Sequence, residues 1–331
     1  MRKILTVSIA AYNVQDTIER ALDSLLDSRI NDDLEIFVVD DGGKDETLTI
    51  AKRYAEQYPN TVFPIHKENG GYGSTINASL ARATGKYFKQ LDGDDWFLKE
   101  NFIEFIEVLR HTDADCVISE VADYFAGSNE QRLNEEHKNI PEGMHSFANI
   151  EFDSVITMHG TAIKTEILQK NNIKIIEHCF YSDTELVVLP MPYLNNFYMF
   201  KKAVYVYYIG AEGQSMSLGG IEKHYPDHEK VYWELVEAYN NIPKEETNKR
   251  NIVLMRLAKE AVYQFEFLCC LPINRKHKNE LKEFGNKLKR EYPDIYEATR
   301  SRRRMTRILW DTNYMAYPLI ARRTRGKYQN R

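Results

Sequence analysis

Three carboxylates within four positions, Asp92, Asp94 and Asp95, are the residues of this chain best suited to chemistry, and Gly93 lies between them. They directly follow an apolar segment that ends at Leu91. Carboxylates this close repel one another unless a cation lies among them, and Mg²⁺ or Mn²⁺ bridging a diphosphate is the usual occupant. An acidic turn that caps a following helix is the alternative interpretation. A second acidic turn earlier in the chain favours the cation site.

That second turn, Asp40-Asp41, follows the apolar segment 34–39, and another apolar segment covers 4–11. Between these segments, residues 17–26 carry apolar side chains at helical spacing, so the sequence predicts a βαβ unit. In parallel sheets, ligands collect beyond the carboxyl ends of the strands. We therefore expect three polar strand ends to meet in one crevice: Tyr12 and Asn13, Asp40 and Asp41, and Asp92 to Asp95.

A glycine cluster, Gly70-Gly71-Tyr72-Gly73, follows a predicted strand near 62–65 and precedes a predicted helix at 75–83. It has neither the Gly-Lys-Ser/Thr ending of a phosphate-binding loop nor the spacing of a dinucleotide-binding motif. We interpret the glycines as permitting close approach of the backbone to a ligand. A flexible turn is the alternative.

In order and spacing, four motifs resemble those of the inverting family 2 glycosyltransferases, which have a GT-A nucleotide-diphospho-sugar-binding domain. They span about a hundred residues, which makes their combination far more specific than any one of them. The four are Ala11-Tyr12-Asn13, Val38-Val39-Asp40-Asp41-Gly42, Asn69-Gly70-Gly71 through Asn77, and the strand Ala83 to Phe88 leading into the DXD motif Asp92 to Asp95.

The resemblance implies a role for each matching residue. Ala11 and Asp41 would hold the nucleotide base, expected to be uracil, and Asp40 would shape that turn. Asp92 would contact the ribose, and Asp94 or Asp95 would bind the Mn²⁺ or Mg²⁺ that bridges the phosphates. Further donor contacts would come from Tyr12, Asn13, Asn69, Gly70, Gly71, Asn77 and Gly93. The chain departs from the family pattern at Gly43-Lys44, in place of Ser-Thr, and at Ile76, in place of Arg.

An inverting sugar transfer also needs a general base that takes the proton of the acceptor hydroxyl. Asp183 stands at the head of an apolar segment, where it resembles the family's catalytic aspartate. Glu185 is the second candidate, either as the base or as a residue that orients the site. A helix cap formed by Ser182 and Asp183 is the alternative interpretation, and both roles can hold together.

Two weaker features complete the expected site. The strand 204–209 and the loop after it resemble the family's Tyr-x-Tyr strand and Ser-x-Ser loop, in which Ser215 and Ser217 would cover the donor diphosphate. His159 lies in the region that lines the acceptor site in the family, although a lone histidine is more often structural. The polar segment 124–150 is expected to be a mobile lid or a disordered surface loop.

The length of 331 residues suits one catalytic domain of about 220 residues and a helical addition. We expect an α/β fold of the GT-A type, with a Rossmann-like, mostly parallel sheet flanked by helices, over residues 1–220. Residues 1–115 would form its nucleotide-binding half and 116–220 its acceptor-side half. A helical extension would cover 221–331, with helices near 225–240, 245–271 and 276–292 separated by prolines.

Composition fits a cytoplasmic protein with a distinctive tail. The net charge is −5, and no run reaches the roughly 18 apolar residues of a membrane span. Four cysteines without metal-ligand spacing predict free thiols in a reducing compartment. Residues 300–331 hold ten basic residues but a single acid, Asp311. Such a tail suits peripheral contact with the inner membrane face, packing between subunits of a homo-oligomer, or a solvated surface; nothing supports nucleic-acid binding.

The sequence thus predicts a metal-dependent inverting glycosyltransferase that moves a hexose or N-acetylhexosamine from a UDP-sugar to a hydroxyl of a glycan, glycoprotein or lipid-linked saccharide. Polysaccharide or glycoprotein biosynthesis would be its setting. Two alternatives remain. A sugar-nucleotide pyrophosphorylase should carry a glycine-rich loop with Arg and Lys near 11–21, and the chain has none. A non-catalytic nucleotide-sugar-binding or scaffold subunit would bind the donor without transferring it.

Overall fold

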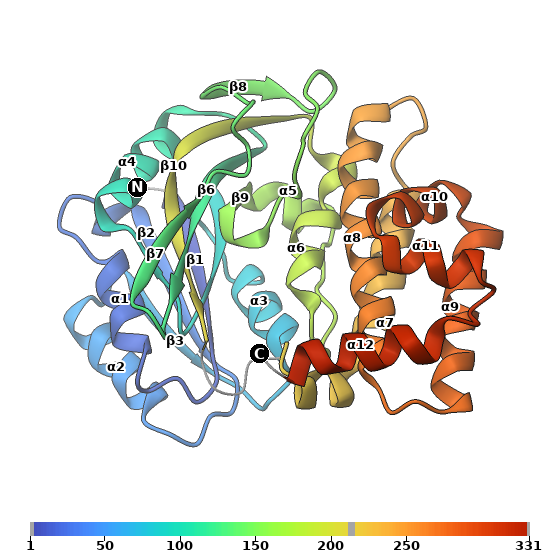
Figure 1. Cartoon of the computed structure of the whole chain (residues 1–331). Helices are drawn as coiled ribbons and strands as arrows, with labels where there is room; N and C mark the ends of the chain where they lie inside the picture. Colours follow the sequence, from blue (N-terminus) through green and yellow to red (C-terminus); the bar gives the residue numbers. More distant parts are fainter. Residues whose placement is uncertain (1–2, 211–215, 330–331) are drawn as a thin grey trace. The chain divides into compact units, whose positions relative to one another are not determined.

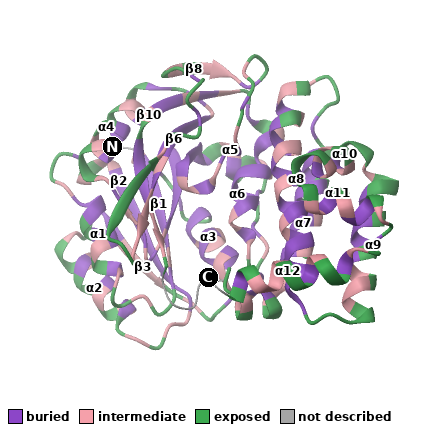
Figure 2. Ribbon diagram, in the orientation of Figure 1, coloured by how far each residue is buried: buried purple, intermediate pink, exposed green. Residues whose placement is uncertain are grey.

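The computed structural model describes residues 3–210 and 216–329. The chain divides into two compact units, Met1–Ala211 and Glu212–Arg331 (Figure 1). The first unit is a sheet flanked by helices, and the second consists of helices. Each unit has its own buried apolar residues, and Figure 2 marks the buried residues of any type in purple.

A single ten-stranded sheet forms the core of the first unit, in the order β3-β2-β1-β4-β9-β6-β10-β5, with β7 paired to β6 and β8 to β10. The strands are β1 Leu5–Ala11, β2 Leu34–Asp40, β3 Val62–His66, β4 Tyr87–Asp92, β5 Trp96–Phe97, β6 Cys116–Phe125, β7 Glu130–Asn134, β8 Gly143–Ser146, β9 Thr161–Lys164 and β10 Asn196–Ile209. Strands β1 to β4 pair in parallel, whereas β9 is antiparallel to both β4 and β6. The sheet is therefore mixed.

The register of the parallel strands brings the predicted polar ends together. Ala11 of β1 lies beside Asp40 of β2, and Ala10 lies beside Asp92 of β4. These strands are buried along nearly their whole length, so their apolar residues fix both the register and the face. The carboxyl ends of three strands thus meet at one edge, as expected from the sequence.

Helices cover the sheet of the first unit: α1 Ile18–Leu25, α2 Thr47–Gln57, α3 Tyr72–Leu80, α4 Lys99–His111, α5 Thr165–Lys170 and α6 Glu185–Val188, with short 3₁₀ turns η1 Asn31–Asp33, η2 Met158–Gly160, η3 Ser182–Thr184 and η4 Met191–Tyr193. In α1, the buried residues Ile18, Ala21, Leu22 and Leu25 match the predicted apolar spacing. Helix α3 begins three residues earlier than expected, because Gly71, with φ of +79°, starts the helix within the glycine cluster.

The segment 124–150 differs from the expected mobile lid or disordered loop. It contains β7, which pairs with β6, and β8, which pairs with β10. Four of the five residues of β7 are exposed, so this edge strand lacks the apolar alternation by which a strand is recognised in a sequence. Backbone hydrogen bonding to β6 defines the strand.

The second unit contains α7 Leu218–Asn240, α8 Thr247–Cys270, α9 Arg275–Glu291, α10 Pro293–Arg302, α11 Arg304–Asp311 and α12 Tyr317–Gln329. Helix α8 is its centre, because α7, α9, α10 and α12 all pack against it. The aromatic residues Phe265 and Phe267 of α8 are buried in this packing. All four cysteines are free and buried. In the part of the chain that the structure describes, no helix has the length and apolar character to cross a bilayer.

Candidate active site

The acidic turn follows β4 and lies against the end of β1. The N–H of Gly93 donates to the carbonyl oxygen of Ala10 at 3.1 Å. A Cβ at position 93 would come within 2.8 Å of that same oxygen, so a residue larger than glycine would push the turn away from β1. Glycine at this position therefore holds Asp92, Asp94 and Asp95 at the sheet edge.

Two tyrosines and a backbone amide hold the carboxylates of this turn. The Tyr72 hydroxyl donates to Asp92 Oδ1 at 2.7 Å, and the Tyr205 hydroxyl donates to Asp95 Oδ2 at 2.5 Å. The other oxygen of Asp95 accepts the N–H of Tyr208 at 2.7 Å. Burial raises the pKa of both Asp92 and Asp95, and repulsion from neighbouring carboxylates raises each pKa further. Burial also raises the pKa of Asp94.

Asp92, Asp95 and His159 together form a group suited to a cation. One ligand atom from each lies within 4.8 Å of the others. Hydrogen bonds leave further lone pairs on both carboxylates, and a bound cation would relieve the repulsion that raises their pKa values. This donor set fits a divalent metal. Asp94, a predicted metal ligand, is half-buried beside the group, whereas Asp95 is fully buried.

His159 is brought to the cluster by the turn η2. Its carbonyl oxygen accepts a hydrogen bond from Lys89 Nζ at 2.6 Å. Its ring packs against the rings of Tyr205 and Tyr207, with centroids 4.8 and 4.9 Å away. Lys89 is completely buried in β4, and this burial lowers its pKa to about 7. His159, which the sequence predicts to contact the acceptor, therefore lies at the edge of the acidic cluster.

The first acidic turn organises the glycine cluster. Asp41 is buried, and its carboxylate accepts hydrogen bonds from Lys67 Nζ at 2.6 Å, from the N–H groups of Gly70 and Gly71 at 2.9 and 2.8 Å, and from the Ser74 hydroxyl at 3.2 Å. Its neighbour Asp40 accepts the N–H of Gly43 at 3.0 Å and lies 2.6 Å from His66 Nδ1. Both predicted residues thus hold the loops at this edge of the sheet in place through hydrogen bonds from buried positions.

Asn77 ties the start of α3 to the segment that leads to the predicted base. Its amide donates to the carbonyl oxygen of Ile175 at 2.8 Å and accepts the N–H of Ile175 at 2.9 Å. Further along, His178 N–H donates to the carbonyl oxygen of Gly70 at 2.5 Å. Because this segment is fixed to α3 and to the loop before it, the turn η3 that follows has a defined place.

Asp183 lies on η3 and is half-buried. Its negative charge helps to raise the pKa of Asp92, Tyr72 and Tyr207, after the larger effect of burial on each. Asp183 therefore lies within electrostatic range of the acidic turn. Glu185 is fully buried, and its carboxylate accepts the N–H of Ile176 at 2.7 Å. This contact makes Glu185 a support of the segment before η3.

The remaining predicted residues occupy varied positions. Tyr12 is 52% exposed beside the crevice, and Asn13, with φ of +54°, accepts the N–H of Lys44 at 2.8 Å. The Asn69 amide donates to the carbonyl oxygen of Asp41 at 2.9 Å. Ser217 is the N-cap of α7 and accepts the N–H of Gly220 at 3.2 Å. Ser215 lies outside the described residues.

Sequence reasoning missed three side chains that build the site. Tyr72 binds Asp92, and Lys89 binds the backbone of His159. Arg20 of α1 donates to the carbonyl oxygen of Asp94 at 2.6 Å, and its guanidinium lies 4.0 Å from the ring centre of Trp96. Of these three, only Lys89 could have been noticed in the sequence. A lysine within an apolar strand is costly to bury unless its ammonium group is hydrogen-bonded, so it indicates a partner nearby.

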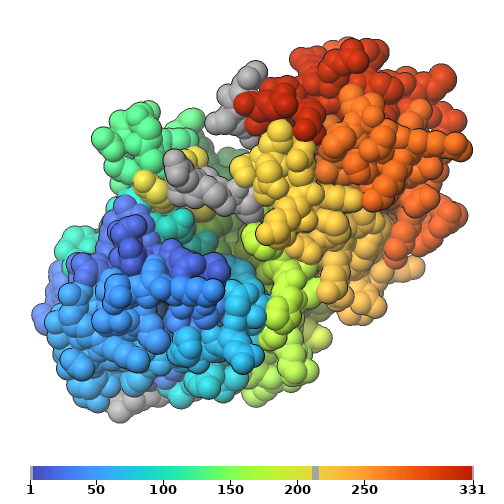
Figure 3. Space-filling view, turned by 90° about the horizontal axis from the view of Figure 1, so that it is seen from below, coloured from blue at the N-terminus to red at the C-terminus, as the bar shows by residue number. Residues whose placement is uncertain are grey.

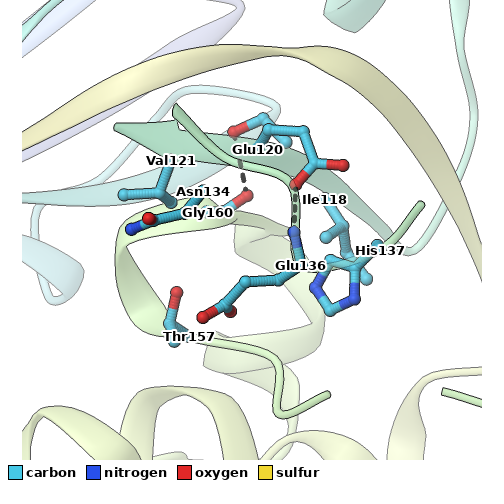
Figure 4. Close-up of a pocket in the computed structure, with 9 residues that line it drawn as sticks. Ile118, Glu120, Val121, Asn134, Glu136, His137, Thr157 and Gly160 are labelled. Carbon is cyan, nitrogen blue, oxygen red and sulfur yellow. Dashed lines mark hydrogen bonds between the residues drawn. The ribbon is translucent and has the colours of Figure 1, made fainter. Parts of the chain in front are cut away.

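A small hollow lies next to η2 and is lined by β6, by the end of β7 and by the residues that follow β7 (Figure 4). Its volume is about 10 Å³, which suits a single water molecule and not a sugar. Glu120, which Lys201 pairs at 3.0 Å, lines it together with Glu136, His137 and Gly160. We regard it as part of the packing that supports η2.

Residues 6–171 of the chain match the family model described as glycosyl transferase family 2. Among curated proteins, the chain is similar to the minor teichoic acid biosynthesis protein GgaB of Bacillus subtilis (strain 168), at 27% identity over 232 residues, which is 68% of this chain and 25% of GgaB. The chain spans 25%, 35% and 52% of the lengths of the first three curated relatives.

Solved structures show the same fold. One is the structure of S. aureus TarS 1–349 in complex with UDP-GlcNAc. The alignment covers 98% of this chain and 89% of the TarS chain, at a TM-score of 0.67 and 18% identity. The mannosyltransferase PcManGT from Pyrobaculum calidifontis, in complex with GDP-Man and Mn²⁺, covers 98% of this chain and 87% of its own, at a TM-score of 0.54 and 15% identity. The GT-A fold expected from the sequence is confirmed.

Proposed function

Because the chain belongs to glycosyltransferase family 2, we propose that it transfers a sugar from a UDP-sugar to a hydroxyl acceptor, with inversion at the anomeric carbon. One observation carries this proposal. Asp183, on the separate turn η3, lies within electrostatic range of Asp92, which belongs to the acidic turn suited to a cation-bound diphosphate. An inverting transfer needs a base on one side of the sugar and stabilisation of the leaving group on the other.

The donor would occupy the crevice at the ends of β1, β2 and β4. Ala11 and the Asp41 turn would contact the base, and we assign Asp92 to the cation in place of the ribose. The UDP-GlcNAc complex of TarS supports a UDP-sugar, since the two chains share a fold over nearly their whole lengths. Arg20, at the acidic turn, is well placed to add positive charge near the phosphates.

Asp92, Asp95 and His159 would hold the cation, with Asp94 as a ligand from the rim. When bound, a divalent cation supplies positive charge that neutralises the departing diphosphate. The GDP-Man and Mn²⁺ complex of PcManGT supports such a requirement. Tyr72 and Tyr205 keep the carboxylates in place through their hydroxyl groups.

Asp183 would take the proton of the acceptor hydroxyl while the acceptor oxygen bonds to the anomeric carbon and the bond to the diphosphate breaks. Its half-buried position leaves it accessible to an acceptor, whereas fully buried Glu185 is occupied by the backbone of Ile176. We therefore assign base catalysis to Asp183 and positioning to Glu185. The name of GgaB supports an acceptor among cell-envelope polymers.

The proposal is tested by incubating the protein with a panel of UDP-sugars and GDP-mannose, with Mn²⁺, Mg²⁺ or a chelator, and measuring nucleotide release. We expect release from a UDP-sugar that requires the metal and increases with acceptor. Formation of UTP from pyrophosphate and UDP-sugar would instead indicate a pyrophosphorylase, and tight UDP binding without turnover would indicate a binding subunit.

Asp183→Asn tests the base. We expect kcat to fall by roughly 10²–10⁴-fold, the usual contribution of a general base, while UDP and Mn²⁺ still bind by calorimetry. Glu166→Gln, an exposed carboxylate on α5, is the matched control and should retain full activity. Unchanged kcat in Asp183→Asn would remove Asp183 from the mechanism.

A further inference from the structure

The last two helices of the second unit and the turn between them combine exposed apolar side chains with exposed arginines. This α11–α12 face consists of Arg304 and Arg307 on α11, Met315 in the turn between the helices, and Leu319, Arg322 and Arg323 on α12. In Figure 3, the red surface marks the C-terminal helices to which these residues belong. The donor crevice and its proposed chemistry do not involve it.

The apolar part of this face is unusually exposed. Met315 and Leu319 are 75% and 73% exposed, more than any other large apolar side chain that the structure describes. Leu319, Arg322 and Arg323 share one side of α12, because they are three and four positions apart, and Met315 lies in the turn just before this helix. On the opposite side of α12, Tyr317, Ala321 and Tyr328 are buried against the unit. Packing of these residues therefore leaves the other side of α12, with Leu319, Arg322 and Arg323, exposed to solvent.

The arginines of this region fall into two groups. Arg300, Arg303 and Arg325 form ion pairs with Asp311, Glu266 and Glu222 at 2.7, 2.9 and 2.7 Å. Arg304, Arg307, Arg322 and Arg323 are exposed and form no ion pair with any residue in the ranges 3–210 and 216–329. The fold thus neutralises the first group and leaves the second group available, in a chain whose net charge is −5.

We propose that the α11–α12 face binds the surface of an anionic phospholipid bilayer. The arginines would contact lipid phosphates, and Met315 and Leu319 would enter the boundary between headgroups and acyl chains. A soluble polyanion would satisfy the arginines but would leave both apolar side chains in water. The combination therefore favours a bilayer as the partner.

Vesicle flotation with the full chain tests this proposal without any donor or acceptor. We expect the protein to float with vesicles of phosphatidylcholine containing about one third phosphatidylglycerol, to bind vesicles of phosphatidylcholine alone at least about ten-fold more weakly, and to be released by high salt. Absence of binding to the anionic vesicles would overturn the proposal. This outcome would leave the proposed catalysis untouched, because nucleotide release is measured separately.

Paired variants locate the contact. Arg322→Ala/Arg323→Ala should weaken vesicle binding by roughly five-fold for each charge removed, whereas Arg275→Ala/Lys282→Ala, exposed cations on α9, should have little effect. Leu319→Ser should weaken binding by roughly ten-fold, and Ile273→Ser, 43% exposed outside this face, should not. Equal losses in variants and controls, or binding to soluble polyphosphate that matches binding to vesicles and ignores Leu319→Ser, would contradict a bilayer contact.

Discussion

Lys89 links the core of the sheet to the acidic cluster. Its ammonium group lies 5.6, 5.9 and 5.8 Å from the ring centres of Phe97, Phe105 and Tyr205, and it donates to the backbone of His159. A buried lysine costs free energy unless its proton donors are used. Here they fix the turn that carries His159, so Lys89 would act on the proposed metal site through a second residue.

Lys89→Met should weaken Mn²⁺ binding by roughly 10- to 100-fold, because residues that orient a ligand have effects of this size. The side chains have similar volume, so we expect the fold to be retained. Calorimetric titration of Mn²⁺ in the presence of UDP measures the effect.

Lys86→Met is the control for this change. Lys86 lies just before the same strand, and its Nζ donates to the carbonyl oxygen of Thr112, away from η2. It should leave Mn²⁺ affinity unchanged. If both variants bind Mn²⁺ equally well, Lys89 has no positioning role.

The chemistry-bearing acids could be predicted from the sequence because they follow apolar strands directly. The strand register places Asp40 and Asp92, and Asp41 directly follows Asp40. Their partners could not be predicted in this way. Tyr72 and Tyr205 reach the acidic turn across 20 and 110 residues of sequence, and such contacts depend on how helices and strands pack. The convergence of His159 with Asp92 and Asp95 has the same origin.

The N-terminus of α3 and the segment 175–178 form a joint between the two halves of the site. Gly73 is at its centre, because a Cβ at this position would overlap the carbonyl oxygen of Ile176. Asn77 and Gly70 add hydrogen bonds on either side. The joint holds η3, and hence Asp183, at a fixed place relative to the donor loops.

Gly73→Ala should push the segment 175–178 away from α3. We expect a loss of about 1–3 kcal/mol in the free energy of unfolding, the usual cost of overpacking, and a larger relative loss in kcat than in UDP affinity. Urea unfolding and steady-state kinetics measure the two effects.

Gly219→Ala on α7 is the matched control, because a Cβ there meets nothing within 4 Å. It should leave the free energy of unfolding unchanged or raise it, since alanine favours helices. Normal stability and activity in Gly73→Ala would show that the segment 175–178 can move without consequence.

Elements with strong apolar patterns were predictable, and polar ones were not. β1, β2 and α1 lie within one or two residues of the expected bounds. The strands β7 and β8 escaped prediction because they pair along the edges of other strands and expose much of their side-chain surface. Their pairing is a long-range event with no local signature.

Buried acids in the two units affect stability with opposite dependence on pH. In the first unit, the raised pKa values of Asp92 and Asp95 mean that stability of the metal-free protein falls as pH rises above the ordinary carboxyl value of 3.8. In the second unit, Glu260 is buried between His228 and Arg256. Burial alone would raise its pKa, but these partners outweigh burial and lower the pKa to about 2.

Because the folded pKa of Glu260 lies below its ordinary value of 4.5, its stabilising effect is complete above pH 4.5 and is lost as pH falls toward 2. Glu260→Gln should therefore lower the free energy of unfolding by up to about 3 kcal/mol at pH 7 and by little near pH 2. Urea unfolding at several pH values, with exposed Glu283→Gln on α9 as control, measures this. An equal loss at every pH would assign the effect to packing.

The saturated carboxylate of Asp41 has a consequence for how the donor is received. With Lys67, Gly70, Gly71 and Ser74 already bound to it, the loop proposed to receive the nucleotide is assembled before any ligand arrives. Preorganisation of this kind removes the entropic penalty of ordering a loop upon association. UDP alone should consequently engage the crevice rapidly, with little rearrangement of the surrounding backbone.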